Sequence, residues 1–256
     1  MRANHTQRLL REGHIVLGTM IGEWGAPEVV RTLARAGFDF VVVDNEHAPF
    51  DLQTNCALYR AARTTAMDML VRVPDAQYHL IARTLDAGAD GVMVPRIETP
   101  EQARQVLDAV KYPPIGRRGC ATRPIHTDLE PVALGDYAAH LNANTMVILQ
   151  LETKAAVERA DDILAVPGID AALIGPADLS VSLGVPGEIE HPLMEDHIAR
   201  VVEAAQRAGV ASGIHWANAD IVKQWMQRGM RCIMYSWEMG FLTAGAQAAV
   251  TEIRGA

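Results

Sequence analysis

The stretch "FVVVDNEHAPF" (residues 40–50) contains the pattern on which the predicted fold depends. It begins as an unbroken apolar run and then ends in three ionisable residues, Asp44, Glu46 and His47. An apolar run without alternating polar positions is typical of a parallel strand that is buried on both faces. The charges that follow it indicate that the strand ends at a functional surface.

Seven more apolar runs of this kind occur along the chain. They are "IVLGTMIG" (15–22), "MLVRVP" (69–74), "GVMVPRI" (91–97), "MVILQLE" (146–152), "AALIGP" (171–176), "VASGIHW" (210–216) and "CIMYSW" (232–237). Helical patterns lie between them, for example at 26–37, 77–90, 100–110 and 198–210. This alternation predicts an α/β fold, a (β/α)8 TIM barrel formed by residues 1–256 as a single domain. A doubly wound open sheet is the alternative, but no glycine-rich phosphate-binding motif follows any run.

Composition narrows the class of protein. The 256 residues are 49% hydrophobic and 21% charged, which is ordinary for a globular enzyme, and the net charge is −8. An acidic balance argues against nucleic acid as a partner, because phosphate-backbone binding needs a basic face. No signal-peptide pattern and no apolar run of about 18 residues is present, so we expect a cytoplasmic protein without a membrane partner.

In barrels of this kind the active site lies at the carboxyl-terminal ends of the strands. Polar residues collect at those predicted ends, on different strands. They are Asp44, Glu46, His47, Arg72, Arg96, Gln150, Glu152, Asp178, His215, Trp216, Ser236 and Glu238. We therefore expect these side chains to surround one site.

Glu152 and Asp178 follow consecutive strands, which are neighbours in a barrel. Two carboxylates without nearby Cys or paired His suit a hard divalent ion, Mg²⁺ or Mn²⁺, that keeps several waters. The alternative is that each carboxylate only caps the helix or turn that follows it. The segment "GPADLS" (175–180) also leaves backbone N–H groups free to face an anion.

His47 follows Asp44 by three residues at a strand end. A buried carboxylate that orients an imidazole is a common arrangement for a general base, so we favour a catalytic pair over a structural histidine. Arg72 lies inside an apolar strand and must be paired if it is buried. It forms either a structural salt bridge to Glu46 or Asp44, or a clamp on a substrate carboxylate or enolate oxygen, and we favour the clamp. No role is assigned to Glu46.

Several segments together resemble one enzyme family. They are "VVVDNEHAPFDLQT" (41–54), "VRVP" (71–74), "GVMVPRIETPEQA" (91–103), "YPPIGRRG" (112–119), "QLET" (150–153) and "IGPADLS" (174–180). The sequence is similar to the metal-dependent (class II) pyruvate aldolases of the 4-hydroxy-2-oxoheptanedioate (2,4-dihydroxyhept-2-ene-1,7-dioate) aldolase type. The resemblance implies a barrel of the phosphoenolpyruvate/pyruvate-domain type. It also implies a C-terminal helix swapped between protomers of a homohexamer, a dimer of trimers.

The resemblance further implies a reaction, the reversible cleavage of a 4-hydroxy-2-oxo acid to pyruvate and an aldehyde through a metal-stabilised enolate. It implies Glu152 and Asp178 as ligands of Mg²⁺ or Mn²⁺, with Co²⁺ as a further candidate and no organic cofactor. Arg72 would neutralise the enolate oxygen, and His47 with Asp44 would move the proton.

The remaining implied roles concern substrate binding. The implied contacts to pyruvate are Gln150, Gly175, Pro176, Ala177 and Asp178, and those on the aldehyde side are His215 and Trp216. Three further residues are weaker candidates. Arg118 keeps the family motif, and Asp86 corresponds to a position that family members contribute from a neighbouring subunit. Arg123 lies in a segment, 120–124, that departs from the family pattern, and it is a candidate contact for an acidic aldehyde. Tyr235, Trp237 and Glu238 differ from the usual pattern of the last strand and either reshape the mouth or pack against the swapped helix.

The lysine content independently favours a metal over a Schiff base. Only three lysines are present: Lys111 follows a helical pattern, Lys223 lies within one, and Lys154 lies beyond Glu152. Enolate chemistry without a metal needs a lysine at the site.

Three alternatives to the aldolase stay open. A citryl- or malyl-thioester lyase would share the barrel but would need a basic channel for its nucleotide thioester. An oxaloacetate decarboxylase would share the site. A keto-acid-binding protein without activity would require the loss of a catalytic group, yet all the candidate groups are present.

Overall fold

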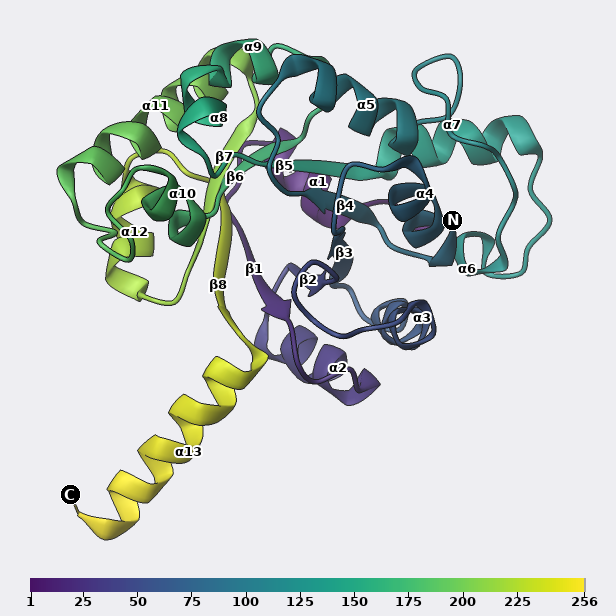
Figure 1. Ribbon diagram of the computed structural model, residues 1–256. Coiled ribbons are helices and arrows are strands. Elements are labelled where there is room, and N and C mark those ends of the chain that lie inside the picture. The colour runs from purple at the N-terminus through teal and green to yellow at the C-terminus, as the bar shows by residue number, and fades with distance from the viewer. Residues whose placement is uncertain (256) are drawn as a thin grey trace.

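The computed structural model describes residues 1–255, which form a closed barrel of parallel strands in the order β1 to β8 (Figure 1). The strands are β1 (Val16–Ile21), β2 (Phe40–Asp44), β3 (Asp68–Arg72), β4 (Gly91–Val94), β5 (Met146–Gln150), β6 (Ala171–Ile174), β7 (Ala211–Trp216) and β8 (Cys232–Trp237). Each predicted apolar run coincides with one strand, although β3 begins one residue before its run, and each strand pairs with its neighbour in sequence, with β8 closing on β1. The prediction of a (β/α)8 barrel is confirmed.

Helices surround this barrel and connect its strands. They are α1 (His5–Arg11), α2 (Pro27–Ala36), α3 (Leu52–Ala62), α4 (Tyr78–Ala87), α5 (Pro100–Val110), α6 (Pro124–Thr127), α7 (Leu134–Asn144), α8 (Lys154–Glu158), α9 (Ala160–Leu164), α10 (Pro176–Ser182), α11 (Pro192–Ala208), α12 (Ala219–Gln227) and α13 (Glu238–Arg254). The helices predicted at 26–37, 77–90 and 100–110 are confirmed as α2, α4 and α5. The helix expected at 198–210 begins earlier, because His191 caps it and Pro192 occupies its first turn.

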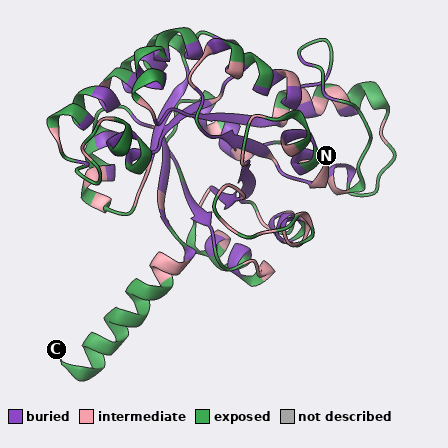
Figure 2. Ribbon diagram, in the orientation of Figure 1, coloured by how far each residue is buried: buried purple, intermediate pink, exposed green. Residues whose placement is uncertain are grey.

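Two apolar layers explain why the strands lack polar alternation. In β2, Phe40 and Val42 pack inside the barrel, whereas Val41 and Val43 pack against the surrounding helices. Both faces of the strand are therefore buried, as Figure 2 shows for the strands in general. The helices in the same view are exposed on their outer faces, which is the pattern of an amphipathic helix on a sheet.

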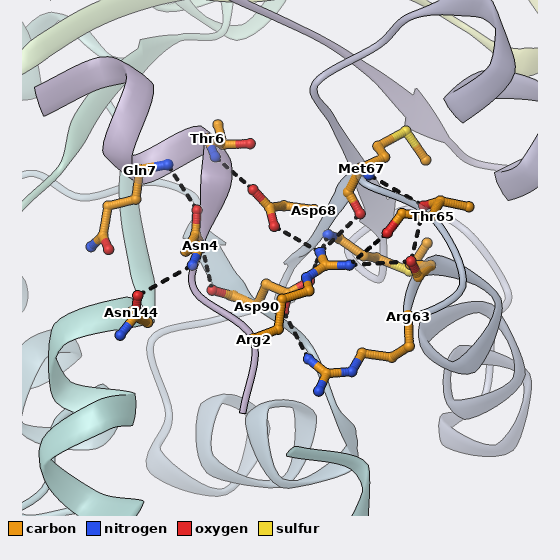
Figure 3. A network of polar contacts seen from close by, with 12 residues as sticks. Arg2, Asn4, Thr6, Gln7, Arg63, Thr65, Met67, Asp68, Asp90 and Asn144 are labelled. Carbon is orange, nitrogen blue, oxygen red and sulfur yellow. Dashed lines mark hydrogen bonds and ion pairs between the residues drawn. The ribbon is translucent and has the colours of Figure 1, made fainter. Parts of the chain in front are cut away.

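A polar network closes the amino-terminal end of the barrel (Figure 3). Asp68, at the start of β3, accepts a hydrogen bond from Arg2 at 2.7 Å and another from the backbone N–H of Thr6 at 2.6 Å. Arg2 also lies 3.1 Å from Asp90, which precedes β4. Asn4 caps α1 by accepting the N–H of Gln7. These contacts fix α1 across the end of the barrel opposite to the predicted site.

The last helix, α13, extends away from the barrel (Figure 1). Of its residues only Glu238 is buried, and the rest of the helix is half-buried or exposed. Within residues 1–255 no helix is both long enough and apolar enough to cross a bilayer. The exchange of α13 between protomers stays a prediction.

Candidate active site

Alternation along the strands carries polar side chains to the carboxyl-terminal mouth of the barrel. Because Phe40 and Val42 point inward, Asp44 takes the next inward position, where β2 ends. Arg72 follows inward-facing Leu70 in the same way, and Asp44 pairs in register with Arg72. The same spacing from inward-facing residues brings Gln150, Gly175, His215 and Ser236 to the mouth.

A cavity of about 380 Å³ opens there. Its lining is His47, Arg72, Gln150, Gly175, Pro176, Ala177, Asp178, His215, Trp216, Ala217, Ser236 and Trp237. Apart from the three weaker candidates, every residue predicted to contact the substrate lies on this cavity. Of the twelve strand-end residues expected at one site, seven line this cavity, and Asp44, Glu46, Arg96, Glu152 and Glu238 do not.

Asp44 and Arg72 form a bidentate ion pair in this mouth. Arg72 Nε donates to Asp44 Oδ1 at 2.9 Å, and Nη2 donates to Oδ2 at 2.7 Å. Burial acts to raise the pKa of Asp44, but the hydrogen bonds and charge of Arg72 outweigh burial and leave that pKa lowered. Nη1 of Arg72 also lies 3.3 Å from Glu46 Oε2. The buried guanidinium is thus compensated by two carboxylates, as the salt-bridge alternative anticipated, and its role as a clamp stays a prediction.

The expected pairing of the Asp44 and His47 side chains is wrong. Asp44 Oδ1 accepts the backbone N–H of Glu46 at 2.9 Å and that of His47 at 3.4 Å, and both of its oxygens also bind Arg72. The His47 side chain is 66% exposed, with Nε2 3.9 Å from Glu46 Oε2. A guanidinium on the neighbouring strand can satisfy both carboxylate oxygens at once, whereas the imidazole can reach only one. Asp44 therefore holds the loop of His47 through backbone contacts.

Glu152 is a buried carboxylate just beyond the end of β5. Its Oε1 accepts the backbone N–H of Arg96 at 2.9 Å, and its Oε2 accepts from Nε2 of Gln150. Burial raises the pKa of Glu152 to about 7, and the negative charge of Asp178 contributes to this shift. Glu152 does not cap the next helix, because Thr153 caps α8. The capping alternative is therefore wrong for Glu152.

The donor set at this point fits a hard cation. Oε1 of Gln150 is buried and has no hydrogen-bond donor among residues 1–255. A Cβ added at Gly175 would lie 2.5 Å from Glu152 Oε2, so the backbone approaches the carboxylate as closely as only glycine allows. No group of three or more Cys, His, Asp or Glu side chains converges in the described part of the chain. Mg²⁺ tolerates such a site, because it often binds one or two carboxylates and takes its other ligands from substrate and water.

Part of the cavity lining is aromatic. Nε2 of His215 donates to the carbonyl oxygen of Ser236 at 2.9 Å, which fixes one tautomer of the ring. Burial lowers the pKa of His215, so the imidazole is neutral near pH 7. Trp216 and Trp237 line the same cavity. This part of the lining offers apolar surface and one neutral ring rather than charge.

A comparison with known families decides the classification. The family model described as HpcH/HpaI aldolase/citrate lyase matches residues 25–243. The chain belongs to this family. Its membership confirms the resemblance drawn from the sequence motifs.

Several named relatives of this HpcH/HpaI family member are aldolases. The chain is 33% identical over 243 residues to the 2-keto-3-deoxy-L-rhamnonate aldolase of Escherichia coli K12, covering 95% of this chain and 87% of that one. It is 32% identical over 247 residues to the 2-dehydro-3,6-dideoxy-6-sulfogluconate aldolase of Pseudomonas putida, covering 96% of each. The crystal structure of an HpcH/HpaI aldolase from Desulfitobacterium hafniense DCB-2 superposes with a TM-score of 0.92 at 34% identity, covering 97% and 96% of the two chains. Aldolases are carbon–carbon lyases, so the predicted enzyme class is confirmed.

Two mouth residues of this family member received no role from the sequence. Glu46 is paired with Arg72 and lies 3.4 Å from Nη2 of Arg96. Arg96 has a left-handed backbone with φ of 54°, which directs its N–H to Glu152. Its guanidinium donates to the carbonyl oxygen of Pro74 at 2.8 Å. The only signal in the sequence was the position of Arg96 at a strand end.

Glu238 has a structural place at the same end of the barrel. Its carboxylate accepts the backbone N–H groups of Gly22 at 3.0 Å, Glu23 at 2.6 Å and Trp24 at 2.8 Å. Because Glu238 is also the first residue of α13, it joins that helix to the loop after β1. The sequence left two roles open for this strand end, reshaping the mouth or packing against the swapped helix. The contacts of Glu238 favour neither.

The three weaker candidates lie apart from the mouth cavity. Arg118 is buried, donates to Asp86 at 2.6 Å and stacks 4.8 Å above the ring of Tyr112. Asp86 and Arg123 line a different cavity among the outer helices. Within one chain the structure does not bring these residues to the site.

Proposed function

We propose that this protein is a divalent-metal-dependent aldolase that cleaves 4-hydroxy-2-oxo acids to pyruvate and an aldehyde. One observation carries the proposal: Gln150, whose Oε1 has no partner within residues 1–255, and the buried guanidinium of Arg72 both line the mouth cavity, and the buried carboxylate of Glu152 is hydrogen-bonded to Gln150. A 2-keto acid needs these two kinds of group, oxygen ligands for a cation and a fixed positive charge for the enolate oxygen. The names of the aldolase relatives support the same reaction.

Glu152, Asp178 and Gln150 would hold the ion. When bound, Mg²⁺ or Mn²⁺, with Co²⁺ as a further candidate, supplies Lewis-acid polarisation of the keto acid. No organic cofactor is needed for this chemistry. The backbone N–H groups at the start of α10, from Gly175 to Asp178, would bind the pyruvate carboxylate.

Arg72 would stabilise the negative charge that forms during cleavage. The C3–C4 bond breaks, its electron pair passes to the enolate, and the C4 hydroxyl proton leaves as the aldehyde carbonyl forms. A guanidinium already fixed by Asp44 and Glu46 needs no reorganisation to donate to that enolate oxygen. His47, on the same cavity, would accept the hydroxyl proton and a proton would then be delivered to C3 to give pyruvate.

His215, Trp216 and Trp237 would form the aldehyde side. Their wall is apolar apart from one neutral imidazole. We expect it to govern the choice of aldehyde more than the handling of pyruvate.

The assembly is also a proposal. We propose a homohexamer, a dimer of trimers, in which α13 packs against a neighbouring protomer and Asp86 lies near a neighbouring site. The exposure of α13 beyond Glu238 supports this arrangement, because helices in proteins gain most of their stability from packing against other elements. A cytoplasmic location fits the small-molecule substrates proposed here.

The test is an assay of the purified full chain with pyruvate, glycolaldehyde and either Mg²⁺ or Mn²⁺, with and without EDTA. We expect aldol product only when the metal is present. Product that forms equally well in EDTA would contradict the metal dependence. Turnover of oxaloacetate with no reaction of any aldehyde would instead identify a decarboxylase.

A further inference from the structure

The loop that follows β4 has a strained backbone beside the candidate metal ligands. Val94 ends β4, and Arg96 follows after Pro95 with a φ of 54°, in the left-handed region. That conformation is unfavourable for a residue with a long side chain, because its Cβ comes too close to the next carbonyl oxygen. Strain of this kind persists only where surrounding contacts impose it, and it is concentrated at functional sites. Within residues 1–255, the other non-glycine residues with a positive φ are Asp128, Leu129 and Ser236.

Two backbone hydrogen bonds show what the strained conformation achieves. The N–H of Arg96 donates to Oε1 of Glu152 at 2.9 Å, and the N–H of Ile97 donates to the carbonyl oxygen of Gln150 at 3.3 Å. Both acceptors lie at the end of β5, the strand that pairs with β4 (Figure 1). In an extended strand consecutive N–H groups point to opposite sides, whereas a left-handed residue can direct them to the same side. The conformation of Arg96 therefore lets one loop hold both candidate ligands.

The side chain of Arg96 provides contacts that compensate the unfavourable backbone. Its Nη2 donates to the carbonyl oxygen of Pro74 at 2.8 Å and lies 3.4 Å from Oε1 of Glu46. Pro74 follows β3 and Glu46 follows β2, so the guanidinium connects this loop to the ends of two other strands. These contacts explain why a residue other than glycine keeps a left-handed conformation at this position.

We propose that Arg96 is a positioning residue for the metal site, because its left-handed backbone orients the carboxylate of Glu152 toward the ion. Donors that orient a ligating carboxylate from outside the ligand shell contribute strongly to metal affinity. Arg96 does not line the mouth cavity, so it acts through Glu152 and not on the substrate. Since Glu152 is taken as a ligand, this role of Arg96 rests on the metal-dependent function proposed above.

A matched pair of substitutions separates the backbone of Arg96 from its side chain. Arg96→Asn and Arg96→Val both remove the guanidinium, but asparagine tolerates the left-handed conformation and β-branched valine does not. Calorimetric titration of the metal-free full chain with Mn²⁺, without substrate, gives the metal affinity of each variant. We expect Arg96→Val to bind Mn²⁺ at least about tenfold more weakly than the wild type, and Arg96→Asn to stay within about threefold of it. Arg104→Val, the same exchange at an exposed position of α5, should leave the affinity unchanged.

The possible results separate the role of Arg96 from the proposed function. A wild type that binds no Mn²⁺ at millimolar concentration would contradict the metal-dependent function itself. A wild type that binds Mn²⁺, together with equal affinities for Arg96→Val and Arg96→Asn, would overturn only the role of Arg96. If Arg96→Val loses the circular dichroism of the folded chain, Arg96→Ala replaces it, because alanine also disfavours the left-handed conformation. Equal affinities for Arg96→Ala and Arg96→Asn would then overturn the role.

Discussion

Asp44 and Arg72 are the two residues on which the proposed chemistry most depends. They are buried side by side at the ends of β2 and β3, and their two hydrogen bonds at 2.9 and 2.7 Å hold the guanidinium in one orientation. A charge that is fixed before the substrate arrives stabilises a developing anion without further reorganisation. Arg72 is accordingly a group whose removal affects both the reaction and the stability of the mouth.

Arg72→Ala should lower kcat by roughly 10²–10³, the usual loss for one oxyanion donor. It should also lower the free energy of unfolding by about 3–5 kcal/mol, because Asp44 would remain buried without its partner. Arg72→Lys keeps the positive charge but lacks the planar guanidinium group that binds a carboxylate with two hydrogen bonds. Its kcat should therefore lie between that of the wild type and that of Arg72→Ala. Steady-state kinetics and urea unfolding measure both effects. A kcat for Arg72→Ala within threefold of the wild type would exclude the oxyanion role.

Gly175→Ala should weaken the binding of Mn²⁺ by roughly 10–100-fold. The added Cβ would lie 2.5 Å from Oε2 of Glu152 and would therefore displace that carboxylate. Gly135→Ala is the matched control, since a Cβ at that helical position meets nothing within 4 Å. Calorimetric titration of the two variants with Mn²⁺ gives the comparison. Equal affinities would show that Glu152 is not a ligand.

The sequence predicted which residues lie at the site better than it predicted their hydrogen-bond and ion-pair partners. Gln150 and His215 lie at the ends of apolar strands, and that position alone brings them to the mouth cavity. The pairing of Asp44 with Arg72 instead of His47 depends on the register between two strands, which no local pattern encodes. The role of Arg96 depends on a left-handed backbone at a non-glycine residue, for which the sequence has no signal.

At the scale of the elements, the strands were predictable and the long segment between β4 and β5 was not. Strands buried on both faces produce apolar runs that are easy to recognise. The segment after α5 instead forms α6 (Pro124–Thr127) and α7 (Leu134–Asn144), and a small apolar cluster of Tyr112, Tyr137 and Leu141 holds it together with single polar contacts. One of these is the hydrogen bond from His126 Nε2 to the carbonyl oxygen of Leu85 at 2.7 Å.

His126 should make the stability of the protein depend on pH. Burial lowers the pKa of His126 to about 4, whereas an unfolded histidine titrates near 6.5. Between these values the unfolded chain binds more protons, so stability increases as pH increases from about 4 to about 6.5. Because of His126 alone, the free energy of unfolding measured in urea should be about 2 kcal/mol lower at pH 5 than at pH 7.

His126→Gln keeps a donor for Leu85 but cannot titrate in this range. The variant should therefore lose about 2 kcal/mol of the difference in unfolding free energy between pH 7 and pH 5. Arg117→Gln, an exposed change in the same segment, serves as the control. An unchanged difference for His126→Gln would mean that the imidazole is not buried as described.

At the scale of the whole molecule, the two ends of the barrel have different tasks. The amino-terminal end is closed by the network of Arg2, Asp68 and Asp90, which contributes to stability (Figure 3). The carboxyl-terminal end holds the cavity and the candidate ligands. In (β/α)8 barrels the loops at the carboxyl-terminal end vary while the rest of the barrel is kept, so one fold supports different reactions.

The assembly can be tested by removing most of α13. Deleting residues 242–256 keeps Glu238 on its loop and leaves Phe241 packed 5.7 Å from Phe38. Because the deleted part is exposed, the truncated chain should lose only the helical circular dichroism of α13, and its barrel should stay folded. Sedimentation velocity should show a hexamer for the full chain and a smaller species for the truncated one. A truncated chain of unchanged mass would exclude the proposed exchange of α13.

The central claim is that Glu152 and Asp178 hold a divalent ion that allows a keto acid to lose a carbon-bound proton. The most direct measurement is the exchange of pyruvate methyl protons in D₂O, followed by proton NMR without any aldehyde. We expect the chelator-treated protein and the Asp178→Ala variant to exchange no faster than buffer, and Mn²⁺ or Mg²⁺ to restore exchange only to the wild type. Full exchange by the metal-free wild type, or by Asp178→Ala, would contradict the claim.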